Sequence, residues 1–358
     1  RQLSQSYYDS LITPNSITSR VWERPVNVDT ALRKMEKARL RKELTGLSPE
    51  EARKLQRKVV QGGDWNSTKR ADLTQAYDNS IRVRFKPNLD FIVKGVRTTT
   101  NAHGMKDRPY ALTKPPATYR FALLGGSPEQ GLGIPTEQSM DNLLEDSLSE
   151  SIEWNAYENV EVLNFSSGQY TLMEQVAVAE NLLEEFSPDA IMLYLHNVDE
   201  IGRMTSRVAS NMIDGSADEY RYLATLRKEL NITGDTDLLT ALDQLTPFAD
   251  ELYFWGLDRL ARYCAEYNIE LVVIYMGVLI DEADASRRNR ATILPDLARR
   301  NFHVIDLYDV YDGNNKADLM IAPWDDHPNA QAHALLADAI SRQIQLNNSW
   351  FLEADPNN

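Results

Sequence analysis

Three short segments of this chain carry the residue types that acyl transfer needs. The first contains Ser127 after two glycines, the second ends at Gly168, and the third contains His327 beside two aspartates. The first two each follow an apolar run typical of a buried strand, and the third precedes a helical pattern. A serine nucleophile, oxyanion donors and a histidine base are the groups that acyl transfer requires. The combination favours a serine esterase or acyltransferase.

Ser127 is the predicted nucleophile. It follows the strand predicted over 119–124, in a turn that Gly125 and Gly126 permit to be tight. A serine at a strand end, just before a helix, exposes its hydroxyl and leaves its backbone N–H free to stabilise an oxyanion. Taken alone, Gly-Gly-Ser is more often an ordinary turn, so the prediction depends on the other segments.

Two further oxyanion donors are predicted at the ends of the next two strands. The backbone N–H of Gly168 can face a bound oxygen without a side chain in the way, and the amide of Asn197 can reach where backbone cannot. Glycine and asparagine are also common in loops without such a role. We interpret the neighbouring His196 as structural.

His327 is the predicted general base. Asp325 or Asp326 can hold its ring in the right tautomer and stabilise its cation, although a solvent-facing loop would fit the same residues. These acids and those at 199 and 200 lack a second well-placed histidine, so a metal site is disfavoured. We expect no metal and no organic cofactor.

From about residue 118 the chain alternates between short apolar runs and helical patterns. The strands are predicted over 119–124, 160–165, 190–195, 269–276 and 302–307, and the helices over about 137–150, 170–186, 247–267, 289–300 and 330–345. Short, mostly apolar strands are typical of a parallel sheet buried on both faces. The order predicts a three-layer α/β sandwich with a five-stranded parallel sheet and a site at the carboxyl ends of its strands.

The chain divides into three predicted parts. Residues 1–115 form an N-terminal extension of helices and a β-ribbon, 116–346 a hydrolase-like domain with a helical insertion at 200–246, and 347–358 a tail. Two helical patterns between about 28 and 61 break at Gly46, and the second opens with a capping box at Ser48. Their many cations fit a solvated helix face or a docking surface. Alternation over 81–100 predicts an antiparallel ribbon around Pro87-Asn88.

Composition limits the partners and the compartment. The net charge of −15 argues against nucleic acid as a partner, and no apolar run is long enough for a transmembrane segment. The single cysteine, Cys264, has no partner for an internal disulfide and is predicted to be buried. The sequence begins at Arg1, so we expect a removed signal or anchor and a periplasmic or membrane-anchored location, with a cytoplasmic location left open.

The motifs resemble those of the SGNH hydrolases, the GDSL-like lipase/esterase superfamily, over residues 118–345. The family's Gly-Asp-Ser block is similar to Gly125-Gly126-Ser127, with further glycines at 131 and 133. Its second block is similar to Asn164 through Gly168, and its third matches only at Asn197. The segment Asp325-Asp326-His327-Pro328-Asn329 is the most specific match. The segment 101–105 also resembles the lead-in of bacterial relatives, which are often exported or membrane-anchored.

The resemblance implies a flavodoxin-like SGNH fold and assigns the roles. Ser127 is the nucleophile, His327 the base and Asp325 its orienter. The N–H groups of Ser127 and Gly168 and the amide of Asn197 form the oxyanion hole. The departures from the family pattern are Gly126 in place of aspartate, Leu195 and Val198 in place of glycine and aspartate, and Trp324 where the family's acid is usual.

Three functions follow as hypotheses. The first is a serine-dependent carboxylic-ester hydrolase that acts through an acyl-enzyme on a small-molecule or glycan ester, with a carbohydrate substrate by family analogy only. The second is an O-acyltransferase to a glycan, which shares the acyl-enzyme. The third is a non-catalytic binding or scaffold protein, which the altered motif positions favour. The oligomeric state is left open.

Overall fold

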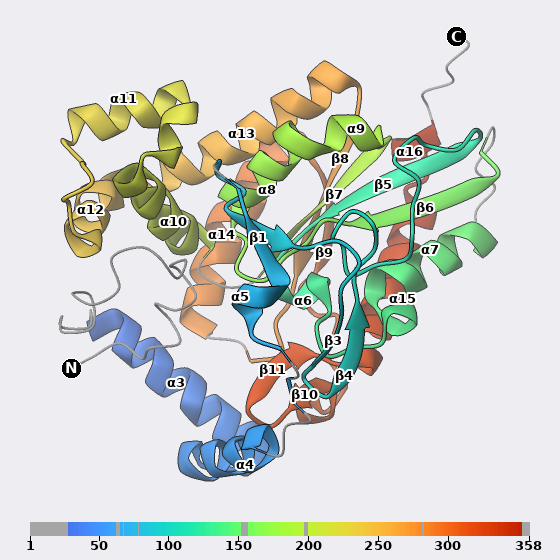
Figure 1. Ribbon diagram of the computed structural model, residues 1–358, viewed down its shortest axis with the longest axis horizontal. Coiled ribbons are helices and arrows are strands. Elements are labelled where there is room, and N and C mark those ends of the chain that lie inside the picture. The colour runs from blue at the N-terminus through green and yellow to red at the C-terminus, as the bar shows by residue number, and fades with distance from the viewer. Residues whose placement is uncertain are drawn as a thin grey trace.

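The computed structural model describes residues 28–61, 65–66, 68–77, 79–151, 157–196, 200–280 and 283–352. Its centre is a five-stranded parallel sheet in the order β6-β5-β7-β8-β9 (Figure 1). The strands are β5 (Thr118–Leu124), β6 (Asn159–Asn164), β7 (Ala190–His196), β8 (Glu270–Met276) and β9 (His303–Leu307). The first strand therefore lies between the second and third, which is a doubly wound order with its switch point between β5 and β7. The predicted strands and fold class are confirmed.

Helices cover both faces of the sheet because each buried strand directs apolar side chains to both sides. Every residue of β5 is buried: Ala122 and Leu124 join one apolar cluster, and Phe121 and Leu123 the other. The first cluster contains residues of α8 (Leu172–Val178), α9 (Glu184–Phe186), α13 (Ala249–Tyr267) and α14 (Ala283–Arg299); the second contains residues of α7 (Met140–Ser151) and α15 (Ala330–Leu346). The result is the predicted three-layer sandwich.

The edges of two predicted helices differ in the structure. The helix predicted over 170–186 consists of α8, a π-helical turn at Ala179–Leu183 and α9, and α14 begins before its predicted start. Cys264 of α13 is buried, as predicted. Within the described residues, no helix combines the length and the apolar character that crossing a membrane requires.

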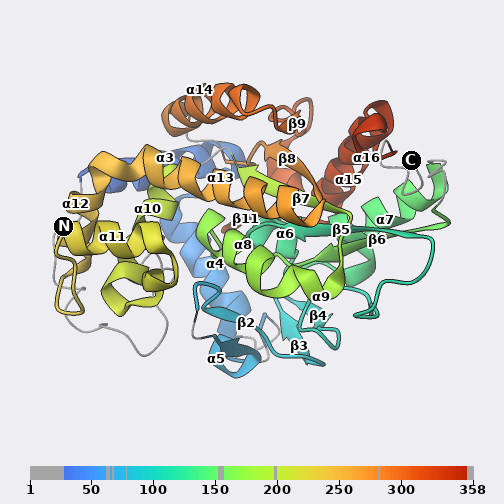
Figure 2. The ribbon, with the colours of Figure 1, turned by 90° about the horizontal axis from the view of Figure 1, so that it is seen from above.

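The insertion after β7 forms three helices: α10 (Glu200–Asp214), α11 (Arg221–Glu229) and α12 (Leu238–Leu245). Met204, Val208 and Met212 lie four residues apart on one face of α10, and all three are buried in the first apolar cluster. This face joins the insertion to the core. Seen from above, α11 and α12 lie at the edge of the molecule farthest from β6 (Figure 2).

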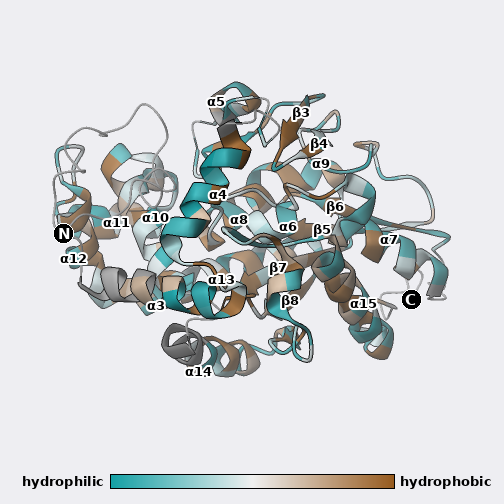
Figure 3. Cartoon of the chain, turned by 90° about the horizontal axis from the view of Figure 1, so that it is seen from below, coloured by the Kyte–Doolittle hydropathy of each residue, from teal (hydrophilic) through white to brown (hydrophobic). Residues whose placement is uncertain are grey.

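The N-terminal region begins with α3 (Val28–Thr45) and α4 (Pro49–Gln61). They separate at Gly46, whose φ of 72° is left-handed, as the sequence predicted. The capping box is also present, because the Ser48 N–H bonds the Glu51 carboxylate at 2.8 Å. Figure 3 shows α4 mostly in the hydrophilic colour.

The predicted position of the ribbon's turn, at Pro87-Asn88, is wrong. After α5 (Arg70–Leu73), β1 (Thr74–Ala76) pairs with β2 (Val83–Phe85), whereas β3 (Asp90–Val93) pairs with β4 (Val96–Thr99). The β3–β4 turn lies at Lys94-Gly95, with φ values of 49° and 79°. A two-residue hairpin turn of this type needs positive φ at both positions, which proline's ring forbids at Pro87.

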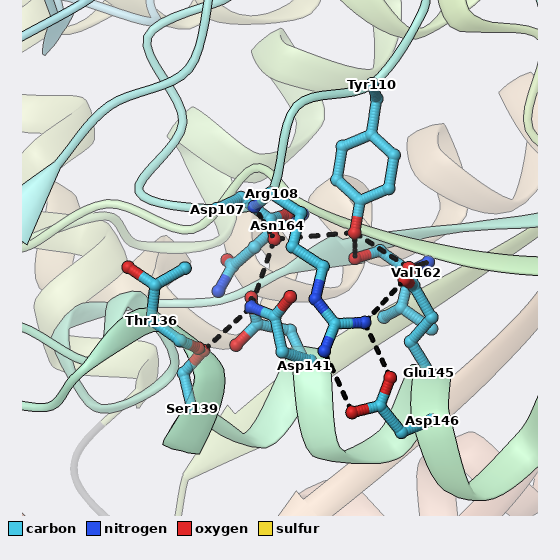
Figure 4. A network of polar contacts seen from close by, with 11 residues as sticks. Asp107, Arg108, Tyr110, Thr136, Ser139, Asp141, Glu145, Asp146, Val162 and Asn164 are labelled. Carbon is cyan, nitrogen blue, oxygen red and sulfur yellow. Dashed lines mark hydrogen bonds and ion pairs between the residues drawn. The ribbon is translucent and has the colours of Figure 1, made fainter.

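A buried polar network ties the lead-in of the sheet to α7 and β6 (Figure 4). Asp107 accepts a hydrogen bond from the Asn164 N–H at 2.8 Å, and Arg108 pairs with Glu145 at 2.9 Å. Burial and the neighbouring Asp141 raise the pKa of Asp107 well above its ordinary value. The network thus fixes the end of β6, where the segment leading to Gly168 starts.

Residues 79–115 also share the apolar core of the sheet. Ile81 and Met105 belong to the same cluster as Leu124 and Leu193 of β5 and β7. The Tyr170 hydroxyl donates to the Val83 carbonyl at 2.9 Å. The packing is therefore continuous across the predicted boundary at 115/116.

Arg120 of β5 joins this lead-in to the sheet. Its side chain is fully buried, and it bonds Glu161 at 2.7 Å and the carbonyl oxygens of Phe186 at 2.7 Å, Leu112 at 3.0 Å and Ala111 at 3.1 Å. Arg120→Met leaves these acceptors without their donor. We expect it to lower the free energy of unfolding by about 3 kcal/mol or more, measured by urea denaturation.

Arg97→Met is the matched control, since Arg97 pairs with Asp90 at the exposed surface. Its denaturation midpoint should stay close to that of the parent protein. An Arg120→Met midpoint that also stays there would contradict the structural role of Arg120.

Candidate active site

Ser127 and His327 come together at the carboxyl end of the sheet. Ser127 begins the short helix α6 (Ser127–Gln130), directly after β5. His327 lies on β11 (Asp325–Pro328), which pairs with β10 (Met320–Ala322) in a small hairpin before α15. The sequence predicted only a loop there. Because Ser127 follows β5, the pair lies beside the switch point of the sheet, where doubly wound folds bind ligands.

The three predicted catalytic side chains form one chain of contacts. The Ser127 Oγ lies 2.9 Å from the His327 Nε2, and the His327 Nδ1 bonds the Asp325 Oδ1. A carboxylate on Nδ1 places the ring proton there, which leaves Nε2 to accept the Ser127 hydroxyl proton. This is the arrangement of a nucleophile, a base and an orienting acid.

Asp325 is held as an anion. Its second oxygen, Oδ2, lies 2.9 Å from the Lys94 Nζ. Burial alone would raise the pKa of Asp325, but His327 and Lys94 outweigh it and hold the pKa far below its ordinary value. The carboxylate therefore stays charged across the whole range in which a histidine base works.

Asp326 faces the other way, toward α3. It pairs with Lys37 at 2.8 Å and with Arg41 at 2.5 Å. Lys37 and Arg41 are four residues apart, so they share one face of the helix. Of the two candidate acids, Asp325 is therefore the one that contacts the imidazole.

A buried glutamate holds the turn that presents Ser127. The Glu129 Oε2 accepts the Gly126 N–H at 2.7 Å, and its Oε1 lies 2.8 Å from the His196 Nε2. A Cβ on Gly125 would fall 2.6 Å from the Glu129 carboxylate, so glycine is needed there. Glu129 was missed by the sequence analysis, although a glutamate three residues after a helix N-cap is the spacing of a capping box.

His196 is a buried cation beneath this turn. Its second ring nitrogen lies 3.3 Å from Glu200. Burial alone would lower the pKa of His196, but the Glu129 and Glu200 carboxylates outweigh it and raise the pKa to about 10. Both ring nitrogens face carboxylates.

The predicted oxyanion donors differ in their surroundings. The Gly168 N–H donates to the side-chain oxygen of Gln130 at 2.9 Å. Ser127 is the first residue of α6, where a backbone N–H has no acceptor within the helix. Asn197 lies outside the described residues. Gln130 was not identified from the sequence, because its contact with Gly168 joins segments far apart in the chain.

His333 is a neutral buried histidine, in contrast to the charged His196. Its Nδ1 accepts the Met140 N–H at 2.9 Å, and burial together with the charge of Lys106 lowers the pKa of His333 to about 3.

The described part of the chain contains no cluster of histidine, cysteine, aspartate and glutamate side chains suited to a metal ion.

The two buried histidines should be distinguishable by NMR. In ¹⁵N-histidine-labelled protein we expect His196 to be doubly protonated at about pH 8 and His333 to be neutral at about pH 5. His196→Asn and His333→Asn assign the two signals. A neutral His196 at about pH 8 would contradict the charged pair with Glu129.

The His196–Glu129 pair also has a pH-dependent effect on stability. Because the pKa of His196 is raised in the folded protein, its stabilisation is fully present below the unfolded pKa of about 6.5 and is lost as the pH rises through about 10. We expect the denaturation midpoint of the parent protein to fall over this range relative to that of His196→Asn. Parallel profiles would show that the pair does not form.

No family model and no curated protein sequence matches this chain. Similar solved structures include TesA, which is 14% identical with a TM-score of 0.42, the alignment covering 63% of this chain and 98% of that one. The esterase EstA from Pseudoalteromonas sp. is 17% identical (TM-score 0.41, 64% and 99% covered). A member of the lipolytic protein G-D-S-L family from Veillonella parvula DSM 2008 is 14% identical (TM-score 0.38, 63% and 98% covered).

Proposed function

We propose that this chain is a serine-dependent carboxylic-ester hydrolase. The observation that supports this most is the contact of 2.9 Å between the Ser127 Oγ and the His327 Nε2, with Asp325 on the other ring nitrogen. A serine hydroxyl is a weak nucleophile unless a base takes its proton, and here the base is within hydrogen-bond reach and oriented by a charged carboxylate.

The acylation step follows from this geometry. His327 takes the Ser127 proton at Nε2 as the Oγ attacks the carbonyl carbon of the ester. The negative charge of Asp325 stabilises the imidazolium that forms. The same proton then passes from Nε2 to the departing alcohol oxygen, and the acyl group remains on Ser127. Deacylation repeats the sequence with water as the nucleophile.

The tetrahedral intermediate needs donors for its oxyanion. We propose the N–H groups of Ser127 and Gly168 and the side-chain amide of Asn197 for this task. Since Gln130 accepts the Gly168 N–H at 2.9 Å, its side chain must move aside for Gly168 to serve. Gln130 therefore competes with the substrate oxygen for this donor.

The turn at Gly126 favours a catalytically active site over one that has lost its activity. The family's aspartate is absent there, which favoured a non-catalytic protein on sequence grounds. Glu129 instead supplies a buried carboxylate to the Gly126 N–H, so the turn has an anionic anchor from one helical turn away. This contact keeps Ser127 at the strand end despite the altered motif.

For the substrate we propose a small acyl ester on a carbohydrate, in an extracytoplasmic compartment, on the family resemblance alone. Transfer of the acyl group to a glycan hydroxyl uses the same acyl-enzyme. Incubation with an acyl donor and a glycan separates the two, because a transferase forms new glycan ester whereas a hydrolase releases only free acid.

Covalent labelling with a fluorophosphonate probe, followed by peptide mass spectrometry, tests the nucleophile. We expect an adduct on Ser127, and a fall in labelling of at least about a thousandfold in Ser127→Ala and His327→Ala. Ser167→Ala is the control, because the Ser167 backbone carbonyl accepts the Tyr170 N–H at 3.1 Å, a contact that alanine keeps. A folded parent protein that gives no Ser127 adduct would remove the proposal.

Substitutions of the two neighbouring acids, Asp325 and Asp326, should have different effects on kcat. We expect Asp325→Asn to lower kcat by about a thousandfold or more, since the wrong imidazole tautomer is then favoured. Asp326→Asn, which leaves the imidazole contact intact, should lower kcat by less than about threefold. Equal losses in the two variants would contradict the assignment of Asp325.

A further inference from the structure

We propose that Lys94, at the tip of the β3–β4 hairpin, is a positioning residue for the catalytic acid: it holds the Asp325 carboxylate in the orientation that His327 requires. The inference rests on the proposed function and adds a part of the N-terminal region to the site. Four observations support it.

The first observation is that Asp325 uses its two oxygens for different partners. Oδ1 bonds the His327 Nδ1, whereas Oδ2 lies 2.9 Å from the Lys94 Nζ. The two side chains of the ion pair are each only 15% exposed. Little water is available to replace Lys94, so the carboxylate is fixed by a partner at each end.

The second observation is the backbone of Lys94. Its φ of 49° is left-handed, a conformation that glycine, asparagine and aspartate adopt far more readily than lysine. Gly95, the other residue of the turn, has a φ of 79° and meets the usual preference. A long charged residue in the first position raises the conformational cost of the turn, and its contact with Asp325 offsets that cost.

The third observation is the path of the lysine stem. A Cβ on Gly133 would lie 2.9 Å from the Lys94 Cβ, 3.0 Å from its Cδ and 3.1 Å from the Ile321 Cδ1. The loop that follows Ser127 therefore has a glycine where the stem passes. Lys94 contacts this loop and, through Asp325, the β10–β11 hairpin.

The fourth observation is the anchoring of the hairpin tip. The Lys94 N–H donates to the Asn66 side chain at 3.2 Å, and the Gly95 N–H donates to the Trp65 carbonyl at 3.0 Å. The Trp65 ring contacts Trp324, with 5.6 Å between the ring centroids. Since Trp324 directly precedes Asp325, the same short segment holds both the lysine and the acid.

Two other cations nearby serve as matched controls. Lys37 and Arg41 of α3 pair with Asp326, one residue from Asp325. They bring similar charge to the same hairpin but bond an acid that faces away from the imidazole. A general effect of positive charge, or of docking the hairpin, would appear in their variants as well.

Removing the Lys94 charge should slow the chemical step. The Asp325 carboxylate then loses one of its two partners, so the imidazole is oriented less well.

The test compares Lys94→Met, Lys94→Arg, Lys37→Met and Arg41→Met in the full chain. The readouts are hydrolysis of p-nitrophenyl acetate and the rate of fluorophosphonate labelling at Ser127. We expect Lys94→Met to lower kcat about tenfold with KM within about twofold. Lys94→Arg and the two α3 variants should stay within about threefold of the parent in both readouts.

The energetic coupling between substitutions at Lys94 and Asp325 gives a second readout. In an Asp325→Asn background, Lys94→Met should have no further effect on labelling, because its target carboxylate is gone. If Lys94→Met does not give the circular dichroism spectrum of the parent, Lys94→Gln, which keeps the stem and a polar tip, takes its place.

The outcomes separate the inference from the proposed function. Ser127 labelling that is equal in Lys94→Met and the parent overturns the role of Lys94 and leaves the hydrolase intact. Equal losses in Lys94→Met and the α3 variants, or a failure of Lys94→Arg to retain activity, also overturn it. No Ser127 adduct in the folded parent protein overturns the proposed function itself.

Discussion

The Asp325 carboxylate lies between His327 and Lys94, and this placement sets the geometry of the whole site. The acid is on a two-stranded hairpin outside the central sheet, so the sheet alone does not position it. Its two oxygens have different partners, the ring of His327 and Lys94 of the β3–β4 turn. A buried carboxylate is costly unless it is paired, and both contacts help to offset that cost.

A second buried charge pair supports the turn that carries Ser127, the proposed nucleophile. Glu129 and His196 lie under the turn that carries Ser127, so the turn has both a hydrogen-bond acceptor for the Gly126 N–H and a cation that compensates it. Removing one partner of such a pair leaves an unpaired charge in the interior, whereas the intact pair fixes the local backbone. Glu129 therefore anchors the turn at Gly126 and holds Ser127 at the strand end.

Local pattern in the sequence was enough to predict the sheet and the proximity of Ser127 and His327. Buried parallel strands are short apolar runs, and the ends of such strands meet at one edge, which is why Ser127 and His327 could be brought together without coordinates. The contacts of Lys94 with Asp325 and of Gln130 with Gly168 could not be found in this way, because they join distant segments through side chains whose types are common on surfaces. The choice between Asp325 and Asp326 was open for the same reason: it depends on α3, whose position no periodicity indicates. The β3–β4 turn was misplaced because Pro87-Asn88 is the stronger turn signal in sequence, while Lys94 takes a conformation unusual for lysine.

These contacts change the interpretation of the basic residues in the N-terminal region. On a chain with a net charge of −15, a run of cations first suggested either a solvated face or a surface for a partner. Lys37 and Arg41 have their partner within the chain, on the hairpin that carries the proposed catalytic acid. Asp107 and Met105 meanwhile connect residues 79–115 to the end of β6 and to the core. A chain cut at residue 115 would thus lose Lys94, which pairs with Asp325, together with the two cations that pair with Asp326.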